Sequence, residues 1–323
     1  MFLVLVLVIV LGAYAYVDRM LGLIQRQPAI QETLSSEQIQ EIENQTDSVD
    51  EGFTGPTIDP TDMTWATDVE QILQEEHVIN ILLIGQDRRP GEGRQRSDAM
   101  ILCSVNTRTN TLTMTSFLRD LYVQIPGYQD NRLNAPYALG GMELLKETLK
   151  VNFGVVVDGC MEVDFSQFEK IIDLMGGVDI TLTSAEAGHL NQNYCFALHA
   201  GENHLNGQQA LAYSRIRYIG TDFGRTNRQR TVLSALVEQS RMISLKQMKV
   251  LLEGILGLMT TDMSNKQILD LALEGFPLLR DLKVNTQCIP AEGTYQFASI
   301  RGMSVIVADL EANRQLLRDT IME

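Results

Sequence analysis

The sequence predicts an α/β protein in which a three-layer α/β/α domain with a mixed central sheet follows a transmembrane helix and an acidic stalk. The chain opens with an apolar run and continues with an acidic segment that has no Lys or Arg. Strand-like and helix-like stretches then alternate irregularly, with a hairpin near their start, which favours a mixed rather than a parallel sheet. The predicted boundaries are 1–24 for the anchor, 25–76 for the flexible stalk and 77–323 for the folded domain.

The opening run, residues 1–17, is almost wholly apolar and continues weakly to residue 24. A helix needs about 20 such residues to cross a bilayer. The alternative is a cleaved signal peptide, but no basic segment precedes the run and Gly12–Ala15 is only a weak cleavage site. We therefore expect a single-pass membrane anchor with the folded domain outside the cytoplasm, although the flanking charges leave the reverse orientation open.

The net charge of −15 is distributed unevenly along the chain. Residues 27–76 contain thirteen Asp and Glu and no Lys or Arg, so the remainder is close to neutral. This composition is typical of an extended, partly disordered stalk, with a transient helix at 32–43 and a short capped helix at 67–76. Nucleic-acid binding needs a broad basic surface. The charge distribution therefore argues against it and favours a focused anion site.

The predicted sheet begins with a buried central strand at residues 78–84, followed by a hairpin of 100–105 and 111–117 around the turn 107–110. Further strands are expected at 155–163, 178–182 and 283–289. Helices are expected at 140–151, 165–174, 207–213, 225–243, 245–259, 265–279 and 304–321. Residues 184–203 are expected to form a long polar loop.

Arginines are concentrated in the segment Gln208–Arg230, which contains no lysine. Its members are Arg215, Arg217, Arg225, Arg228 and Arg230, with Asp222 among them. A solvated basic helix face is the alternative, but such faces usually mix Lys with Arg and interleave Glu. An all-arginine cluster is typical of bidentate recognition of phosphate or carboxylate.

Two carboxylates flank the loop after the first strand. Asp87 directly follows that strand and Asp98 directly precedes the next. If the two strands are antiparallel neighbours, both carboxylates meet at one edge of the sheet and suit Mg²⁺, which takes one or two protein carboxylates plus water and phosphate oxygens. The alternative is that they pair with Arg89 and Arg96. The segments 86–132 and 208–230 together hold twelve of the nineteen arginines and none of the seven lysines, which predicts a site for more than one phosphate.

Other candidate groups are less informative. Cys103 and Cys288 lie in strand-like runs and are expected to be buried thiols, while a disulfide between Cys160 and Cys195 is left open. His189, His199 and His204 share the polar loop with Cys195 but lack the tight spacing of a zinc site. The stripe Leu245, Met248, Leu252, Ile255 and Met259 is expected to be core, with the wall of a lipid pocket as the alternative.

Several segments, in this order, resemble the LytR–CpsA–Psr family of membrane-anchored wall proteins. They are NILLIGQDRR, RSD at 96–98, SFLRD from Ser116, RLNAPY from Arg132, LMGGVDI from Leu174, and LHAGENHLNGQQALAYSRIR with the arginines that follow. The resemblance covers about residue 78 to the C-terminus. Leu118 stands where the family usually has proline, and Pro136 where a small residue is common, which puts loop geometry rather than chemistry in question.

The resemblance implies a phosphotransferase that moves a glycopolymer, such as teichoic acid or capsule, from a polyprenyl diphosphate carrier to peptidoglycan through a phosphodiester. It implies that Asp87 and Asp98 bind Mg²⁺ (or Mn²⁺) and that Asp222 orients or deprotonates the acceptor hydroxyl. It further implies a diphosphate site made by Arg89, Arg119, Arg215 and Arg217 and lined by Arg225, Arg228 and Gln229. Asp87, Asp98, Arg119, Arg217 and Asp222 would then be the catalytic set. A polyprenyl-diphosphate-binding regulatory protein of the envelope and a polyprenyl diphosphate hydrolase are the alternatives.

Overall fold

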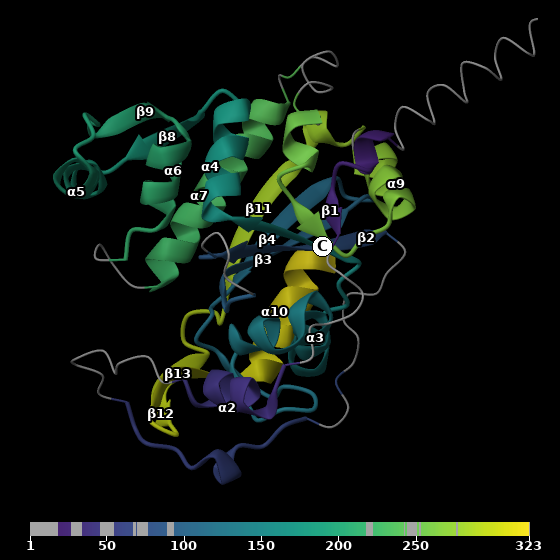
Figure 1. The fold of residues 1–323 in the computed structure, drawn as a ribbon, viewed down its shortest axis with the longest axis vertical. Coiled ribbons are helices and arrows are strands. Elements are labelled where there is room, and N and C mark those ends of the chain that lie inside the picture. Colours follow the sequence, from purple (N-terminus) through teal and green to yellow (C-terminus); the bar gives the residue numbers. More distant parts are fainter. Residues whose placement is uncertain are drawn as a thin grey trace, which may run out of the picture.

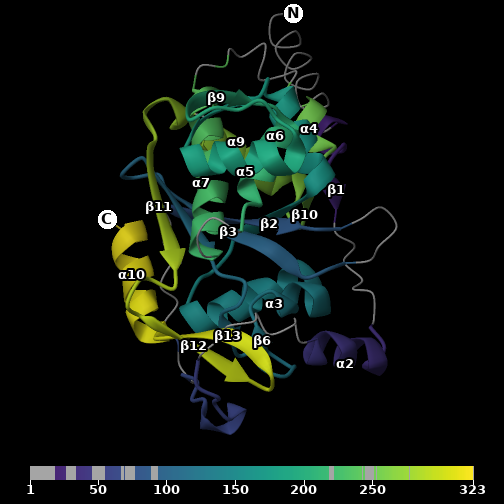
Figure 2. The ribbon, with the colours of Figure 1, turned by 90° about the vertical axis from the view of Figure 1, so that its left-hand side faces the viewer.

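The computed structural model of the 323-residue chain is shown in Figures 1 and 2. It describes residues 19–26, 34–45, 55–66, 69, 77–88, 94–217, 222–241, 243, 251, 253–275 and 277–322. Residues 1–18, which make up most of the predicted anchor, lie outside this set. Among the described residues, no helix has both the length and the apolar character that a membrane crossing requires.

A seven-stranded mixed sheet forms the middle of the molecule, as the sequence predicts. Its strands are, in spatial order, β1 (Gln25–Arg26), β10 (Thr260–Thr261), β7 (Gly159–Asp164), β2 (Val78–Gln86), β3 (Ser97–Asn106), β4 (Thr111–Phe117) and β11 (Lys283–Ile289). Strand β3 runs antiparallel to both of its neighbours, β2 and β4, whereas β7 lies parallel to β2 and β11 parallel to β4. In the turn between β3 and β4, Asn110 has a φ of 55°, a conformation that asparagine tolerates better than most residues.

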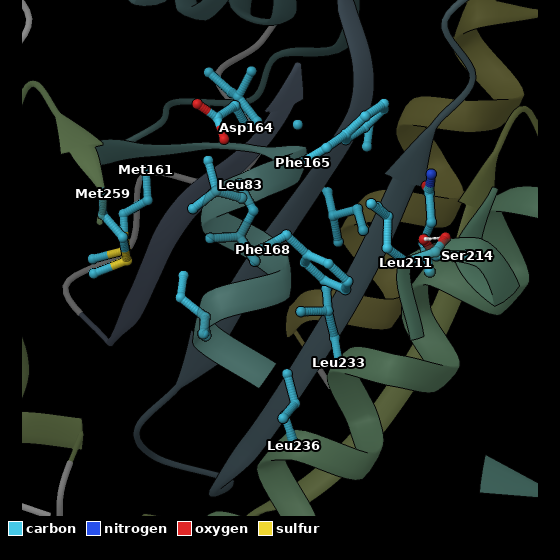
Figure 3. Close-up of a pocket in the computed structure, with 17 residues that line it drawn as sticks. Leu83, Met161, Asp164, Phe165, Phe168, Leu211, Ser214, Leu233, Leu236 and Met259 are labelled. Atoms are coloured by element: carbon cyan, nitrogen blue, oxygen red, sulfur yellow. Dashed lines mark hydrogen bonds between the residues drawn. The ribbon is translucent and has the colours of Figure 1, made fainter. Parts of the chain in front are cut away.

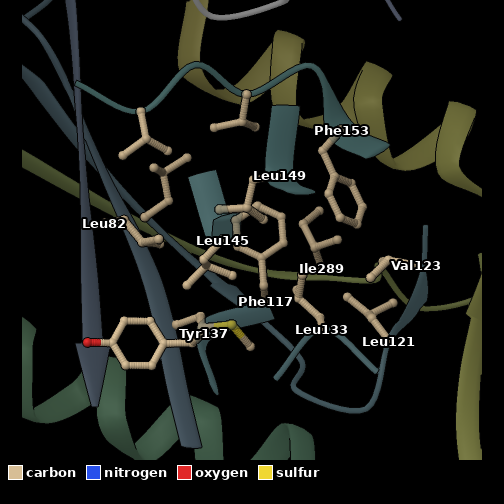
Figure 4. Packing of buried hydrophobic residues seen from close by; sticks show 14 of the residues in the cluster. Leu82, Phe117, Leu121, Val123, Leu133, Tyr137, Leu145, Leu149, Phe153 and Ile289 are labelled. Atoms are coloured by element: carbon tan, nitrogen blue, oxygen red, sulfur yellow. The ribbon is translucent and has the colours of Figure 1, made fainter. Parts of the chain in front are cut away.

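Helices cover both faces of the sheet, so the predicted three layers are confirmed (Figure 2). One face packs against α3 (Ala135–Phe153) and α10 (Leu310–Met322), and the other against α4 (Phe165–Leu174), α6 (Gly207–Ser214) and α7 (Asp222–Ser240). Successive residues of a strand point to opposite faces. Leu82 accordingly enters the main core with Leu145 and Phe153 (Figure 4), whereas Leu83 faces the α7 side.

The structure corrects the predicted polar loop at 184–203. Residues Ser184–Tyr194 form helix α5, and β9 (Gly201–Leu205) pairs antiparallel with β8 (Val178–Leu182). The helix starts at a capping box, in which the Thr183 side chain accepts from the backbone N–H of Glu186 and the Glu186 side chain accepts from the backbone N–H of Thr183. The polar composition of this stretch obscured a local helix signal that Thr183 and Glu186 carry.

The predicted helix at 304–321 is also wrong in its first part. Residues Met303–Ala308 form β13, which pairs with β12 (Tyr295–Ile300), and α10 begins only at Leu310. The run Val305–Val307 is β-branched and suits a strand. The remaining described elements are β5 (Tyr122–Val123), β6 (Asn131–Arg132), α9 (Asn265–Gly275) and the short 3₁₀ turns Pro60–Asp62 and Leu279–Asp281.

The described parts of the predicted stalk pack against the domain instead of extending from it. Helix α2 (Ser36–Asn44) places Ile39 and Ile42 on the main core, and the backbone carbonyl of Glu43 accepts from Asn131 Nδ2 at 3.0 Å. Further along, Trp65 packs beside Tyr122 and donates from Nε1 to Asp130 at 2.7 Å. A few apolar anchors therefore hold segments whose acidic composition predicts disorder. The predicted helix at 67–76 lies outside the described residues except for residue 69.

The four cysteines are free thiols, so the disulfide left open by the sequence is absent. Cys160 is buried on β7, whereas Cys195 is exposed directly after α5. Cys103 was expected to be buried and is partly buried on β3, where desolvation raises the pKa of its thiol to about 12.

Candidate active site

A polar pocket of about 320 Å³ opens beyond the ends of β2 and β3, beside α4, α5, α6 and α7. Its lining residues are Gly85, Asp87, Asp98, Ala99, Phe165, Tyr194, Ser214, Arg215, Arg217, Arg225 and Gln229. Six of these were predicted from the sequence as site residues: two carboxylates, three arginines and Gln229. The structure thus brings together two segments that are more than a hundred residues apart.

The two predicted carboxylates meet at one edge of the sheet because β2 and β3 are antiparallel neighbours. Gly85 pairs with Ala99, and a bulge after Gly85 ends the regular register. Asp98 Oδ1 accepts from Arg119 Nη1 at 2.7 Å and lies 3.8 Å from Arg217 Nη2. Asp87 Oδ2 lies 3.7 Å from Arg215 Nη2. The carboxylates are therefore balanced by arginines from distant parts of the chain.

The alternative is that these carboxylates pair with Arg89 and Arg96, and the structure describes only Arg96 of these two. Arg96 donates from Nη1 to Asn134 at 3.2 Å and from Nη2 to the Ile42 carbonyl at 2.5 Å. Asp98 instead pairs with Arg119. Arg89, predicted to bind the diphosphate, lies outside the described residues.

The Arg225 side chain is buried and extends from α7 toward Asp98. It pairs with Asp222 at 2.8 Å, and its Nη2 lies 3.5 Å from the Asp98 carbonyl oxygen. Burial lowers the pKa of the Arg225 guanidinium, and the neighbouring Arg119 and Arg217 charges act in the same direction. A cluster in which cations destabilise one another's charge is suited to binding an anion. Asp222 keeps 23% of its side chain exposed and contacts Arg225, but it does not line the pocket itself.

Arg228, predicted to line the site, is not among the residues that line this pocket. Its Nε donates to Glu186 Oε1 at 2.7 Å, and its Nη1 donates to the Ile216 carbonyl at 3.0 Å. Both side chains of this ion pair are buried. Because Ile216 lies between Arg215 and Arg217, Arg228 positions the turn that carries two site arginines. Arg230 is also buried and is not among the pocket residues.

Sequence reasoning missed a partly buried carboxylate beside Arg119. Asp120 lies 3.7 Å from Arg119 Nε and 3.6 Å from Arg132 Nη1. Burial raises the pKa of Asp120 above its usual value, although Arg119 opposes the shift. The signal was present in the sequence, because Asp120 ends the SFLRD segment. Arg119 therefore has two carboxylate partners, Asp98 at Nη1 and Asp120 at Nε.

Five of the pocket residues were not predicted as site residues: Gly85, Ala99, Phe165, Tyr194 and Ser214. Phe165 begins α4, and the Arg215 guanidinium carbon lies 4.4 Å from the centre of its ring, a cation–π contact. This contact orients Arg215 without using up its hydrogen-bond donors. No charge or motif marks such aromatic residues in a sequence.

A second cavity, of about 230 Å³, adjoins the polar pocket and is almost wholly apolar. Figure 3 shows it between the sheet and the helices, lined by Leu83, Phe168, Leu211, Leu233 and Leu236 among others. The two cavities share Gly85, Ala99, Phe165, Ser214 and Gln229 as common wall. Met259, the last residue of the apolar stripe predicted as core or lipid wall, lines this cavity. The arrangement suits an amphiphile with an anionic head and an apolar tail.

The donor set of the polar pocket fits a hard divalent cation. Asp87 and Asp98 both open on it, and a phosphate oxygen and water would complete the coordination. No group of three or more His, Cys, Asp or Glu side chains suited to a metal occurs among the described residues. His204, one of the histidines considered for zinc, instead contacts Asp179 at 2.7 Å and the Gly176 carbonyl at 2.7 Å.

Comparison with known proteins places this chain in a defined class, the α/β proteins of the LytR–CpsA–Psr type. The LytR_cpsA_psr family matches residues 31–318. The regulatory protein MsrR of Staphylococcus aureus (strain COL) is 31% identical over 252 residues, or 76% of this chain and 75% of MsrR. The polyisoprenyl-teichoic acid–peptidoglycan teichoic acid transferase TagU of Bacillus subtilis (strain 168) is 34% identical over 180 residues, or 55% of this chain and 57% of TagU.

The solved structures of TagT from B. subtilis are also similar. TagT with bound octaprenyl pyrophosphate gives a TM-score of 0.59 at 25% identity and covers 80% of this chain and 94% of its own. TagT bound to LI-WTA gives 0.63 at 26% identity, with coverages of 77% and 92%. The chain therefore belongs to the LytR–CpsA–Psr family, as the sequence motifs indicated.

Proposed function

We propose that the protein is a phosphotransferase that moves a glycopolymer from a polyprenyl diphosphate carrier to peptidoglycan. The observation that carries the proposal is the pair of adjoining cavities, one with arginines and carboxylates and one apolar, which share a wall at Phe165, Ser214 and Gln229. Binding of octaprenyl pyrophosphate by TagT and the transferase name of TagU support it. The glycopolymer itself is a wall polymer of the teichoic acid or capsule kind.

In this proposal, the polyprenyl chain occupies the apolar cavity and the diphosphate the polar pocket. Arg215, Arg217 and Arg225 neutralise the diphosphate and stabilise the charge that develops during transfer. Arg119, which donates to Asp98 at 2.7 Å, holds that carboxylate in place. Gln229 lines both cavities and marks the boundary between tail and head group.

The transfer step joins the acceptor to the glycan phosphate. A hydroxyl oxygen of peptidoglycan forms a bond to the phosphorus next to the glycan, and the bond from that phosphorus to the bridging oxygen breaks. Polyprenyl phosphate leaves with the electron pair. The hydroxyl proton passes to a carboxylate, for which Asp222 is the candidate, since it is partly exposed and is held by Arg225.

Asp87 and Asp98 would hold Mg²⁺ (or Mn²⁺) in this pocket. When bound, the cation supplies positive charge opposite the diphosphate oxygens. We further propose that residues 1–24 anchor the protein in the cell membrane and that the folded domain is extracytoplasmic, where both the lipid-linked glycan and peptidoglycan are within reach.

A second candidate function is a regulatory protein that binds polyprenyl diphosphate without turnover. The name of MsrR, a regulatory protein that covers three quarters of this chain, favours it. The paired carboxylates at the pocket favour catalysis, because binding of the anion alone needs only the arginines. A polyprenyl diphosphate hydrolase would use the same pocket with water as the acceptor.

The decisive experiment mixes the purified protein with Mg²⁺, a polyprenyl-diphosphate glycan and peptidoglycan oligomers. Mass spectrometry is expected to detect a phosphodiester-linked product together with polyprenyl phosphate. Tight lipid binding without any product would support the regulatory candidate, and release of polyprenyl phosphate without a linked product would support the hydrolase.

Asp98→Asn tests the carboxylates within the same assay. The change keeps the size of the side chain but removes its charge, so the turnover number is expected to fall by about a hundredfold or more. Asp319→Asn, at an exposed position of α10, is the matched control. Full activity of Asp98→Asn would refute the role of this carboxylate in catalysis.

A further inference from the structure

Tyr194 and Phe196 form an aromatic pair at the edge of the polar pocket. Their rings are stacked, with centroids 5.5 Å apart and an interplanar angle of 11°. Tyr194 is 44% exposed and lines the pocket that holds Asp87 and Asp98. Phe196 packs partly against the core beneath α5 and supports the Tyr194 ring from one side. The exposed ring thus lines a polar pocket instead of the hydrophobic core.

The backbone around the pair is held in place before any ligand arrives. Tyr194 ends α5, and Cys195 adopts a left-handed conformation with φ 56° and ψ 33°. The Asn191 side chain closes the loop, because it donates to the Leu198 carbonyl at 2.8 Å and accepts from the Leu198 N–H at 2.9 Å. A preformed surface of this kind loses little entropy when a ligand binds.

The pair is also fixed relative to the arginines of the site. Glu186 lies in the first turn of α5, whose last residue is Tyr194. Its Oε1 accepts a hydrogen bond from Arg228 Nε at 2.7 Å, and Arg228 Nη1 donates to the Ile216 carbonyl at 3.0 Å. The buried Glu186–Arg228 pair therefore connects the aromatic helix to the turn that carries Arg215 and Arg217. These contacts link the helix that carries the Tyr194 ring to the turn that carries the phosphate-binding side chains.

The chemistry of an exposed aromatic face suits a sugar ring. The face of an aromatic ring carries partial negative charge, and the C–H groups of a sugar carry partial positive charge, so the two stack. Tyrosine offers a large rigid surface with only two side-chain torsions to immobilise. Tyr194 lines the polar pocket but not the apolar cavity, so it lies on the side of the diphosphate away from the tail.

We propose that Tyr194, supported by Phe196, binds the first sugar ring of the lipid-linked glycan. That sugar is joined directly to the second phosphate, which places it next to the arginines and away from the polyprenyl chain. The assignment rests on the proposed function and makes Tyr194 a specificity-determining residue, since it recognises the sugar and not the diphosphate.

The test compares two probes by titration calorimetry: farnesyl diphosphate, and farnesyl diphosphate that carries N-acetylglucosamine on its second phosphate. Tyr194→Ala is expected to weaken binding of the sugar-bearing probe roughly fivefold, from the loss of one aromatic contact. Its affinity for farnesyl diphosphate is expected to be unchanged, which also shows that the variant is folded. Tyr194→Phe keeps the ring and is expected to bind both probes as the wild type does.

Phe297→Ala is the matched control, because Phe297 is 46% exposed on β12 and does not line either cavity. It is expected to change neither affinity. If the wild type binds farnesyl diphosphate but Tyr194→Ala weakens both probes equally, or neither, the sugar assignment alone is overturned. If the wild type binds neither probe, the proposed function fails and the sugar assignment fails with it.

Discussion

At the scale of single residues, the site is defined by which charged groups face the pocket and which hold those groups from behind. Asp98 is contacted by Arg119 and Arg217, and Asp87 by Arg215. Asp120 in turn supports Arg119. Each arginine at the pocket thus has a nearby acidic or aromatic group that orients it, but the half-exposed ones keep donors available for an anion.

Arg217→Lys tests whether recognition of the anion is bidentate. A lysine keeps the charge but replaces the planar fork of donors by a point charge. We expect affinity for a polyprenyl diphosphate, measured by titration calorimetry, to fall about tenfold. Arg280→Lys, at an exposed position far along the chain, controls for the loss of any arginine. Wild-type affinity of Arg217→Lys would show that this side chain acts only through its charge.

At the scale of elements, helices α4, α5, α6 and α7 each contribute residues that line the polar pocket. The starts of three of these helices are marked by local signals, because Asp164, Thr183 and Asn206 cap α4, α5 and α6 with capping boxes. Their mutual placement depends on close contacts between them. Gly207, the first residue of α6, lies against the backbone carbonyl of Glu169 on α4, where a Cβ would collide.

Gly207→Ala is therefore expected to force α4 and α6 apart. Because the obstacle is backbone rather than a flexible side chain, the free energy of unfolding should fall by about 2 kcal/mol. Gly188→Ala is the matched control, since Gly188 lies within α5 with open space around it. There the helix propensity of alanine should leave stability unchanged or slightly raised. Urea unfolding of the two variants measures both, and equal stabilities would contradict the packing argument.

The Glu186–Arg228 pair gives stability a pH dependence. Burial acts to raise the pKa of Glu186, but hydrogen bonds from Thr183 and the contact with Arg228 outweigh it and hold the pKa below its ordinary value of 4.5. A carboxyl whose pKa is depressed by folding stabilises the protein above its unfolded pKa, and this contribution is lost as pH falls through the folded value.

We expect Glu186→Gln to lower the free energy of unfolding at pH 7. We also expect the variant to lose less stability than the wild type when the pH falls below about 4.5. Urea midpoints between pH 3 and 7 measure the effect, at roughly half-unit steps. Glu202→Gln, exposed on β9, serves as the control. Parallel pH profiles for the wild type and Glu186→Gln would show that this carboxyl titrates alike in the folded and unfolded states.

At the scale of the whole molecule, the sheet separates a packed core from the ligand side. The face toward α3 is filled by large side chains (Figure 4), whereas the opposite face leaves the apolar cavity between the sheet and the helices (Figure 3). The apolar cavity and the polar pocket share one wall. A single ligand can therefore occupy both only if its apolar tail fits into the cavity.

Leu236→Trp tests this joint use of the two cavities. The larger side chain is expected to fill part of the 230 Å³ cavity. Binding of a long polyprenyl diphosphate should then weaken by about tenfold or more. Binding of inorganic pyrophosphate, which has no tail, should be unchanged. Leu273→Trp, at a position 66% exposed on α9, is the control. Equal loss for both ligands would mean that the cavities do not act together in this way.

The sequence by itself determined the layers of the fold and the main charged groups of the site. Runs such as 78–84 and 111–117 are strands because of their apolar and β-branched composition, which is a local property. Asp87 and Asp98 meet because neighbouring antiparallel strands must bring their ends together. The arginines of the site lie in segments that resemble motifs of the family, so the sequence also indicated that they belong to this site.

Only the tertiary structure decided which of the clustered groups face the pocket. On α7, Arg225 and Gln229 line it while Arg228 turns to Glu186, a choice that depends on the neighbouring helix and not on the spacing of the residues. The same holds for Tyr194, and for the acidic segment 34–45, which two isoleucines of α2 hold on the core. Such contacts join residues far apart in the chain, and composition or periodicity within a short window does not record them.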